Sequence, residues 1–239
     1  MENSFAPLIS GQNLATKRFG GTMTGMAEPY ITGYHFIRFE QIPSIIPEYL
    51  TPYDIGVSSV GQISDMLSGT CLGVTPPGGT LNKAEFTGVG GIKWAVPANI
   101  DYGNSVSVKF LEMAGTPIAH IMHCWVKMMR DYRTGVSHSV SNTGGITKKD
   151  YSSVLYYWTT APDGITVDYC AAYDGVFPTK DPQDLFTSDV ETVGRLDIEI
   201  EFNVDYAWHE PWVKDKCQTL TSAFTEDRET VKDYGDKLK

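Results

Sequence analysis

The chain has 239 residues, of which 41% are hydrophobic and 20% charged, and these values indicate a folded chain with a sizeable core and exclude a disordered one. Nineteen basic against twenty-nine acidic side chains give a net charge of −10, which excludes a protein that grips duplex nucleic acid through a basic surface. Four separated cysteines without a C-x-x-C pair exclude a disulfide framework and a zinc knuckle. We also expect no signal peptide and no membrane insertion, because neither sequence pattern is present.

The first third of the chain predicts one strand followed by irregular structure. Residues 1–33 are rich in glycine and small polar residues and are expected to form an N-terminal arm. Residues 34–39 alternate in polarity and predict the first strand. Three prolines are expected to exclude regular structure up to about Asp54, and we interpret 43–76 as a loop or insert region.

The middle of the chain predicts a strand and one clear helix. Residues 105–110 alternate in polarity, which is typical of a half-buried strand. Thr116 and Pro117 predict the start of a helix, with the threonine hydroxyl as its N-cap. Apolar residues then recur every three or four positions, on a face expected to cover an open end or face of the β structure. The predicted core face of this helix comprises Ile118, Ile121, Met122, Trp125 and Met129.

Two further strands are expected after an exposed loop at 138–150. They span 151–159 and 165–173, and the Pro-Asp-Gly sequence between them predicts a turn, because glycine accepts a positive φ. The turn at 175–178 is expected to end this unit.

The last predicted strand is long, about 14 residues over 193–206. Its even positions from Leu196 onward are apolar and its odd positions are polar, so the two sets face opposite sides of the sheet. Residues 209–239 are interpreted as a charged C-terminal tail, a peripheral helix or partly disordered, with Cys217 as the most exposed thiol.

Three patterns resemble catalytic or metal sites, and each is better explained structurally. His120, His123 and Cys124 have helical spacing, but the helix supplies no acidic ligand to complete a metal site. The Gly-x-Cys-x-Gly pattern at 69–73 precedes a Pro-Pro-Gly-Gly turn, whereas a nucleophile elbow needs a strand, a turn and a helix. Paired carboxylates on the last strand are spaced for glycoside hydrolysis, yet an unbroken acidic stripe gives no means of separating their pKa values. We therefore expect no enzyme activity, no cofactor and no metal.

The negative charge is concentrated in one part of the chain. Twelve acidic and two basic residues lie between Asp163 and Glu210, so this segment alone carries a charge of −10, the net charge of the whole chain. Much of it falls on the polar side of the last predicted strand. The candidate acidic face comprises Asp197, Glu199, Glu201 and Asp205.

The order of these elements resembles the tail tube proteins of contractile-tailed bacteriophages, in the broader group with inner-tube proteins of contractile injection systems. The resemblance covers roughly residues 34–208. It is carried by a glycine-rich linker at 88–94, a single helix containing Trp125, the Gly-Val-Phe-Pro turn at 175–178, and a final strand with an aromatic end at 204–208.

This resemblance implies a mainly β fold, a β-sandwich or split barrel with one flanking helix that completes a β-barrel between subunits. It implies a non-enzymatic structural subunit that forms stacked hexameric rings, the conduit for DNA ejection, in the tail of a virion assembled in the host bacterial cytoplasm. The implied partners are the chain itself, the tail sheath protein, the tape measure protein, and the baseplate and tail terminator proteins. DNA is expected to pass through without specific binding.

Two questions stay open at this point. The acidic face is expected either to line the lumen, where it would repel DNA phosphates, or to face a basic sheath. The role is either that of a tube subunit or that of a baseplate tube initiator or injection-system inner tube. A carbohydrate-binding or hydrolytic β-sandwich is the alternative from another class, because Trp208 and Trp212 lie near acidic residues.

Overall fold

The computed structural model describes residues 33–88, 91–131, 147–182 and 195–223. The elements in chain order are β1 (His35–Glu40), α3 (Ile46–Leu50), η1 (Thr51–Tyr53), α4 (Val60–Thr70), β2 (Cys71–Thr75), β3 (Gly79–Thr87), β4 (Lys93–Tyr102), β5 (Ser105–Leu111), α5 (Pro117–Met129), α6 (Lys148–Tyr151), β6 (Ser153–Thr160), β7 (Val167–Pro178), β8 (Asp197–Asn203) and β9 (Tyr206–Trp208). Residues 211–223 form a further helix, the C-terminal helix. The predicted N-terminal arm up to residue 32, most of the predicted loop at 138–150, and residues 224–239 lie outside the described residues.

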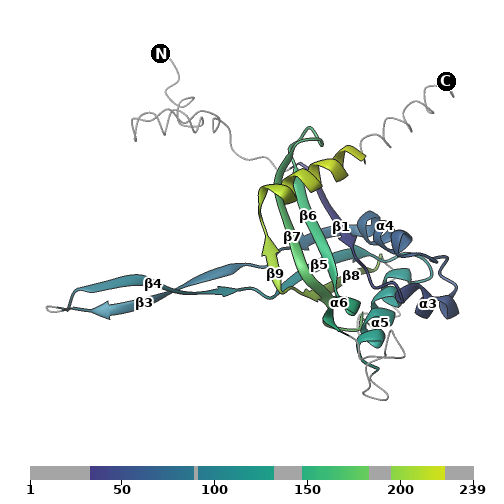
Figure 1. Ribbon diagram of the computed structural model, residues 1–239, viewed down its shortest axis with the longest axis horizontal. Helices are drawn as coiled ribbons and strands as arrows, with labels where there is room; N and C mark the ends of the chain where they lie inside the picture. The colour runs from purple at the N-terminus through teal and green to yellow at the C-terminus, as the bar shows by residue number, and fades with distance from the viewer. Residues whose placement is uncertain (1–32, 89–90, 132–146, 183–194, 224–239) are drawn as a thin grey trace, which may run out of the picture.

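The body of the molecule is built from two antiparallel sheets that share β7 (Figure 1). The joined strand order is β1–β6–β7–β8–β5–β2, with β9 beside β7. One sheet has the order β1–β6–β7–β9, and the other has the order β7–β8–β5–β2. They join where the last residues of β7 pair with β8, Phe177 opposite Asn203 and Pro178 opposite Phe202. The prediction of a mainly β, sandwich-like fold is confirmed. The turn predicted between β6 and β7 is also confirmed, with Gly164 at φ +71°.

The main core lies between the two sheets and is covered by α5. Trp125 of α5 contacts Phe39 of one sheet and Phe202 of the other, each at 6.4 Å between ring centroids, and its Nε1–H donates to the carbonyl oxygen of Tyr151 at 2.7 Å. Because this one side chain touches both sheets, α5 covers the open side between them, as the sequence predicted. Of the predicted face, Ile118, Ile121, Met122 and Trp125 are fully buried, and Met129 is partly buried against the same core.

The helix begins after Thr116 as predicted, but the predicted capping role of the threonine hydroxyl is wrong. Thr116 has a left-handed backbone, φ +51°, and its side chain makes no capping hydrogen bond. Glu112, directly after the end of β5, performs this role instead, because its carboxylate accepts from the backbone N–H of Ile118 at 3.2 Å and of Ala119 at 2.9 Å. A carboxylate at this end also suits the positive end of the helix dipole.

The region predicted to be irregular up to Asp54 contains helices. Pro47 lies in the first turn of α3 and Pro52 in the first turn of η1. A proline is tolerated there, because the first amides of a helix have no partner within it. The prolines therefore mark helix starts in this chain. The longer α4 then begins after Ser59, whose hydroxyl accepts from the backbone N–H of Gln62 at 3.3 Å.

The long final strand is divided in two. β8 runs only to Asn203. Val204 N–H still donates to the carbonyl oxygen of Asn104, just before β5, at 2.7 Å, and the backbone then turns to β7, where Asp205 N–H donates to Asp174 at 2.9 Å. The predicted alternation holds through Val204, which is buried, whereas Tyr206 is exposed. The unit ends at Pro178 as expected, but the turn expected at 175–178 is wrong, because these residues are the last part of β7.

The C-terminal helix packs on the outer face of the β1–β6–β7 sheet and buries a second, smaller core. Val213 and Cys217 on the helix are fully buried against Tyr156 and Trp158 of β6. The prediction that Cys217 is the most exposed thiol is therefore wrong. Within the described ranges, no helix has both the length and the apolar character that crossing a membrane requires.

Candidate assembly surface

A long β-hairpin projects away from the body (Figure 1). It consists of β3 and β4, which pair from Gly79 opposite Tyr102 to Thr87 opposite Lys93, and we name it the projecting hairpin. Its substantial packing contacts are between its own two strands. The interpretation of residues 88–94 as a linker is wrong, because Lys93 and Trp94 belong to β4, and the hairpin itself was not predicted.

Glycines shape the tip of the projecting hairpin. Gly91 has φ +77°, a conformation that side chains with a Cβ rarely adopt, and its N–H donates to the carbonyl oxygen of Gly88 at 3.1 Å. Gly88 N–H in turn donates to Ile92 at 2.8 Å. A Cβ on Gly88 would lie 2.6 Å from the Trp94 ring, so glycine allows this indole to fold over the backbone.

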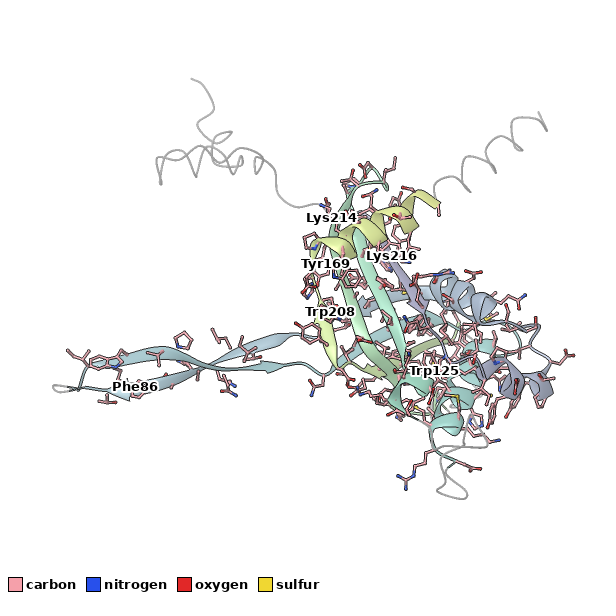
Figure 2. All side chains as sticks on the ribbon, viewed as in Figure 1. Phe86, Trp125, Tyr169, Trp208, Lys214 and Lys216 are labelled. Carbon is pink, nitrogen blue, oxygen red and sulfur yellow. The ribbon has the colours of Figure 1, made fainter. Side chains whose placement is uncertain are left out.

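The distal half of the projecting hairpin has an apolar face and a polar face. Phe86 lies opposite Trp94, and Ala84 lies opposite Val96, so these four side chains occupy one face. The other face carries charged residues, including the Lys83–Glu85 ion pair at 2.7 Å. The large apolar residues of the hairpin are between 43% and 63% exposed, and Figure 2 shows Phe86 far from the body. These are Leu81, Phe86, Ile92, Trp94, Val96 and Ile100.

An exposed apolar surface of this kind marks a site of association. A two-stranded hairpin is marginally stable by itself in water, and burial of one face against another surface would stabilise it. Nothing among the described residues of the same chain covers that face. The hairpin is therefore the candidate assembly surface.

The predicted acidic face lies on β8 and just after it, and it is partly neutralised. Asp197 accepts from Arg195 Nε at 2.7 Å and lies 3.2 Å from Lys109 Nζ. The Arg195 guanidinium, and then Lys109, hold the pKa of the Asp197 carboxyl below its usual range. Asp205 accepts from Lys148 Nζ at 2.6 Å.

The two remaining members of this face are solvent-exposed. Glu199 and Glu201 point outward from β8, and Glu199 accepts from the Ser107 hydroxyl of neighbouring β5 at 2.6 Å. The alternation predicted for these positions is therefore present, but the negative charge is concentrated at two carboxylates instead of four.

A second exposed aromatic group lies at β9 and the start of the C-terminal helix. Trp208 contacts Tyr206 at 4.4 Å and Trp212 at 6.3 Å between ring centroids, and all three are exposed. The ring planes are tilted by 60–61° from each other, so they form a cluster and not one flat platform. A cavity of about 450 Å³ separates the root of the projecting hairpin from β9 and is lined in part by Tyr206 and His209.

The histidine and cysteine residues of α5 do not converge. His123 Nδ1 lies 2.7 Å from Asp181, and the His120 ring packs against the Tyr53 ring at 4.4 Å between centroids. The Cys124 thiol donates to the carbonyl oxygen of Tyr49 at 3.5 Å. In the part of the chain that the structure describes, no group of three or more His, Cys, Asp or Glu side chains is placed to hold a metal ion.

Cys71, the cysteine of the Gly-x-Cys-x-Gly pattern, lies where α4 ends and β2 begins. This helix-to-strand order is the reverse of a nucleophile elbow. Burial raises the pKa of the Cys71 thiol to about 11, which disfavours the thiolate that a nucleophile requires.

Comparisons with known proteins found structural likeness without sequence matches. No protein-family model and no curated protein matches the chain. A chain in the PVC sheath/tube terminator of an extracellular contractile injection system has a TM-score of 0.44 and 10% identity, and the alignment covers 77% of this chain and 98% of that one. A chain in the anti-feeding prophage (AFP) baseplate gives 0.45 and 9%, with coverages of 77% and 96%. A chain in the AFP tube terminating cap gives 0.41 and 11%, with coverages of 78% and 97%. The likeness concerns the fold alone.

Proposed function

We propose that this protein is a non-enzymatic structural subunit that assembles with copies of itself, as the tail tube subunit of a contractile phage tail or related injection system. The observation that carries the proposal is the projecting hairpin, whose apolar distal face is covered by no described part of its own chain. The family resemblance of the sequence supports the same role.

The shape of the molecule favours head-to-tail assembly. A hairpin that inserts into another surface of a neighbouring copy makes a heterologous contact, which generates a ring or a continuing tube. β1 and β2 end the strand order of the two joined sheets, with no further described strand beside them. Pairing of such edges between subunits closes a barrel and removes the aggregation risk of open strands. In this proposal the ring is a hexamer.

The exposed carboxylates of Glu199 and Glu201 fit the wall of a conduit for DNA. Negative side chains repel phosphate over about 8–10 Å at physiological salt, so DNA would pass without adhering. Lysine or arginine at the same positions would create salt-dependent attachment. The proposed partners beyond the chain itself are the tail sheath, tape measure, baseplate and terminator proteins, and the proposed place of action is the virion tail.

Electron microscopy of the purified chain and of paired variants tests the proposal. We expect the wild type to form rings or hollow tubes. Phe86→Ser with Trp94→Ser removes the apolar face and is expected to leave a folded monomer with an unchanged circular dichroism spectrum. Lys83→Ser with Lys93→Ser changes the opposite face by the same number of residues and is expected to assemble. A wild type that stays monomeric, or a Phe86/Trp94 variant that assembles normally, contradicts the proposal.

Carbohydrate binding is a second candidate function, and the exposed Tyr206–Trp208–Trp212 cluster favours it, because aromatic rings stack on sugar faces. A glycan array together with Trp208→Ala tests this function. Binding by the wild type that is lost in the variant would support it, and the absence of binding to any glycan would exclude it.

A further inference from the structure

Two cysteines lie on facing sides of the interface between the C-terminal helix and the sheet. Cys217 is fully buried on the helix, and Cys170 of β7 packs against the same small core. Cys170 lies opposite Trp158 in the sheet, and Trp158 is itself a member of that core. Helix and sheet therefore bring together two thiols that are 47 positions apart in the sequence.

Side chains on both sides of Cys217 hold the helix in place over the sheet. Gln218 accepts from Val167 N–H at 3.2 Å and donates to the carbonyl oxygen of Ile165 at 2.8 Å. Lys216 forms an ion pair with Glu40 at 2.9 Å. Figure 2 shows Lys216 where the helix crosses the strands. These contacts fix the rotation of the helix, so Cys217 faces the sheet and not solvent.

Both thiols pack against the same small core, Cys217 from the helix and Cys170 from β7. Burial, and then the neighbouring Cys170 thiol, raise the pKa of Cys217 to about 12. Ala172, on the same face of β7 as Cys170, is fully buried in the same small core, and its small side chain leaves room for the helix to lie close to the sheet.

We propose that Cys170 and Cys217 form a reversible disulfide that fastens the C-terminal helix to the sheet under oxidising conditions. This inference does not depend on the proposed assembly function. The oxidant is a small-molecule disulfide such as oxidised glutathione.

The reaction proceeds in two exchange steps. Cys170 is partly exposed and attacks first as the thiolate, which breaks the S–S bond of glutathione disulfide and releases one glutathione. Cys217 then attacks the Cys170 sulfur and releases the second glutathione. Two protein thiols are oxidised to one disulfide, one glutathione disulfide is reduced to two thiols, and the two protein protons pass to the leaving thiolates.

The full-length chain is incubated with oxidised glutathione, alkylated with iodoacetamide, and analysed by intact mass and peptide mapping. We expect a loss of two hydrogen atoms, a Cys170–Cys217 linked peptide, and alkylation of only Cys71 and Cys124 after unfolding. Because the thiolate is the attacking form and burial raises the pKa of both thiols, the rate should rise about tenfold from pH 7 to pH 8. Hydrogen exchange of residues 211–223 should slow in the oxidised form.

Three serine variants provide the controls. Cys170→Ser and Cys217→Ser should each abolish the linked peptide, and Cys71→Ser should leave it unchanged. Cys170 is the less buried member, so its variant remains informative if the Cys217 variant does not fold. A stable glutathione adduct on Cys170 without closure, a link to Cys71 or Cys124, or a link between chains would overturn the proposal.

Discussion

The body and the projecting hairpin differ in the burial of their large aromatic residues. Trp125 in the body is 0% exposed and contacts both sheets, whereas Trp94 in the hairpin is 54% exposed. The body thus buries its apolar residues within one chain, and its stability is a property of the monomer. The hairpin carries apolar residues that no described part of the chain buries, and in the proposed assembly a neighbouring copy would bury and stabilise them.

Matched tryptophan substitutions sharpen this comparison and give the largest expected effect. Trp125→Ala should lower the free energy of unfolding by about 3–5 kcal/mol, because it leaves a large cavity between the sheets. Trp94→Ala should change the unfolding free energy of the monomer by no more than about 0.5 kcal/mol. Urea denaturation followed by circular dichroism measures both. Equal losses in the two variants would mean that the hairpin is part of the cooperative body.

Two glycines with positive φ extend the comparison to the backbone. Gly175→Ala should destabilise the body by about 1–3 kcal/mol, because φ is +69° and the new Cβ would lie 2.3 Å from Asp205 Oδ2. Gly91→Ala has similar backbone strain, at φ +77°, but no atom within 4 Å of the new Cβ. It should perturb the hairpin tip and leave the melting temperature unchanged in a thermal scan. A lowered melting temperature for Gly91→Ala would contradict the independence of the two regions.

Removal of the Glu112 cap of α5 is expected to have a smaller effect on the stability of the body. Glu112→Ala should cost about 1 kcal/mol of stability, because the backbone N–H groups of Ile118 and Ala119 lose their acceptor. Glu112→Gln keeps an acceptor oxygen and should lose less. Chemical denaturation of the two variants side by side measures the difference, and an unaffected Glu112→Ala variant would show that the cap is not needed.

The smallest expected effect on folding is at the exposed carboxylates. Glu199→Lys with Glu201→Lys should change stability by no more than about 0.5 kcal/mol, since both residues are at the surface. The assembled variant should nevertheless bind DNA at low salt and release it at high salt, whereas the wild type should not bind. Electrophoretic mobility of DNA with each assembly measures this. An assembled variant that does not retain DNA would argue against a lumenal position for these residues.

Sequence reasoning was most successful where one face of an element is buried. The helix containing Trp125 and the alternation of β8 follow from that rule, since burial imposes the helical or strand period on the apolar residues. The break after Asn203 was not predictable in this way, because it depends on a backbone hydrogen bond from Asp205 to Asp174, which is distant in sequence. The Glu112 cap was missed because it comes from outside the helix it serves.

The projecting hairpin was missed for a different reason. Neither face of the hairpin is buried against the described body, so the burial rule that identifies core strands did not apply to it. A signal was nevertheless present, because apolar residues alternate on both sides of a glycine-rich turn, at Phe86 before it and at Trp94 and Val96 after it. The acidic face was predicted from the alternation of polar and apolar residues in β8. That alternation could not predict the ion pairs of Asp197 and Asp205, because their lysine partners lie elsewhere in the chain.

Cryo-electron microscopy of the assembled chain, at a resolution that shows side chains, tests the central claim most directly. We predict density from a neighbouring copy against Phe86, Trp94 and Val96, with all three side chains buried at that contact. An assembly in which these side chains face solvent, or in which the hairpin folds back on its own body, would contradict the account.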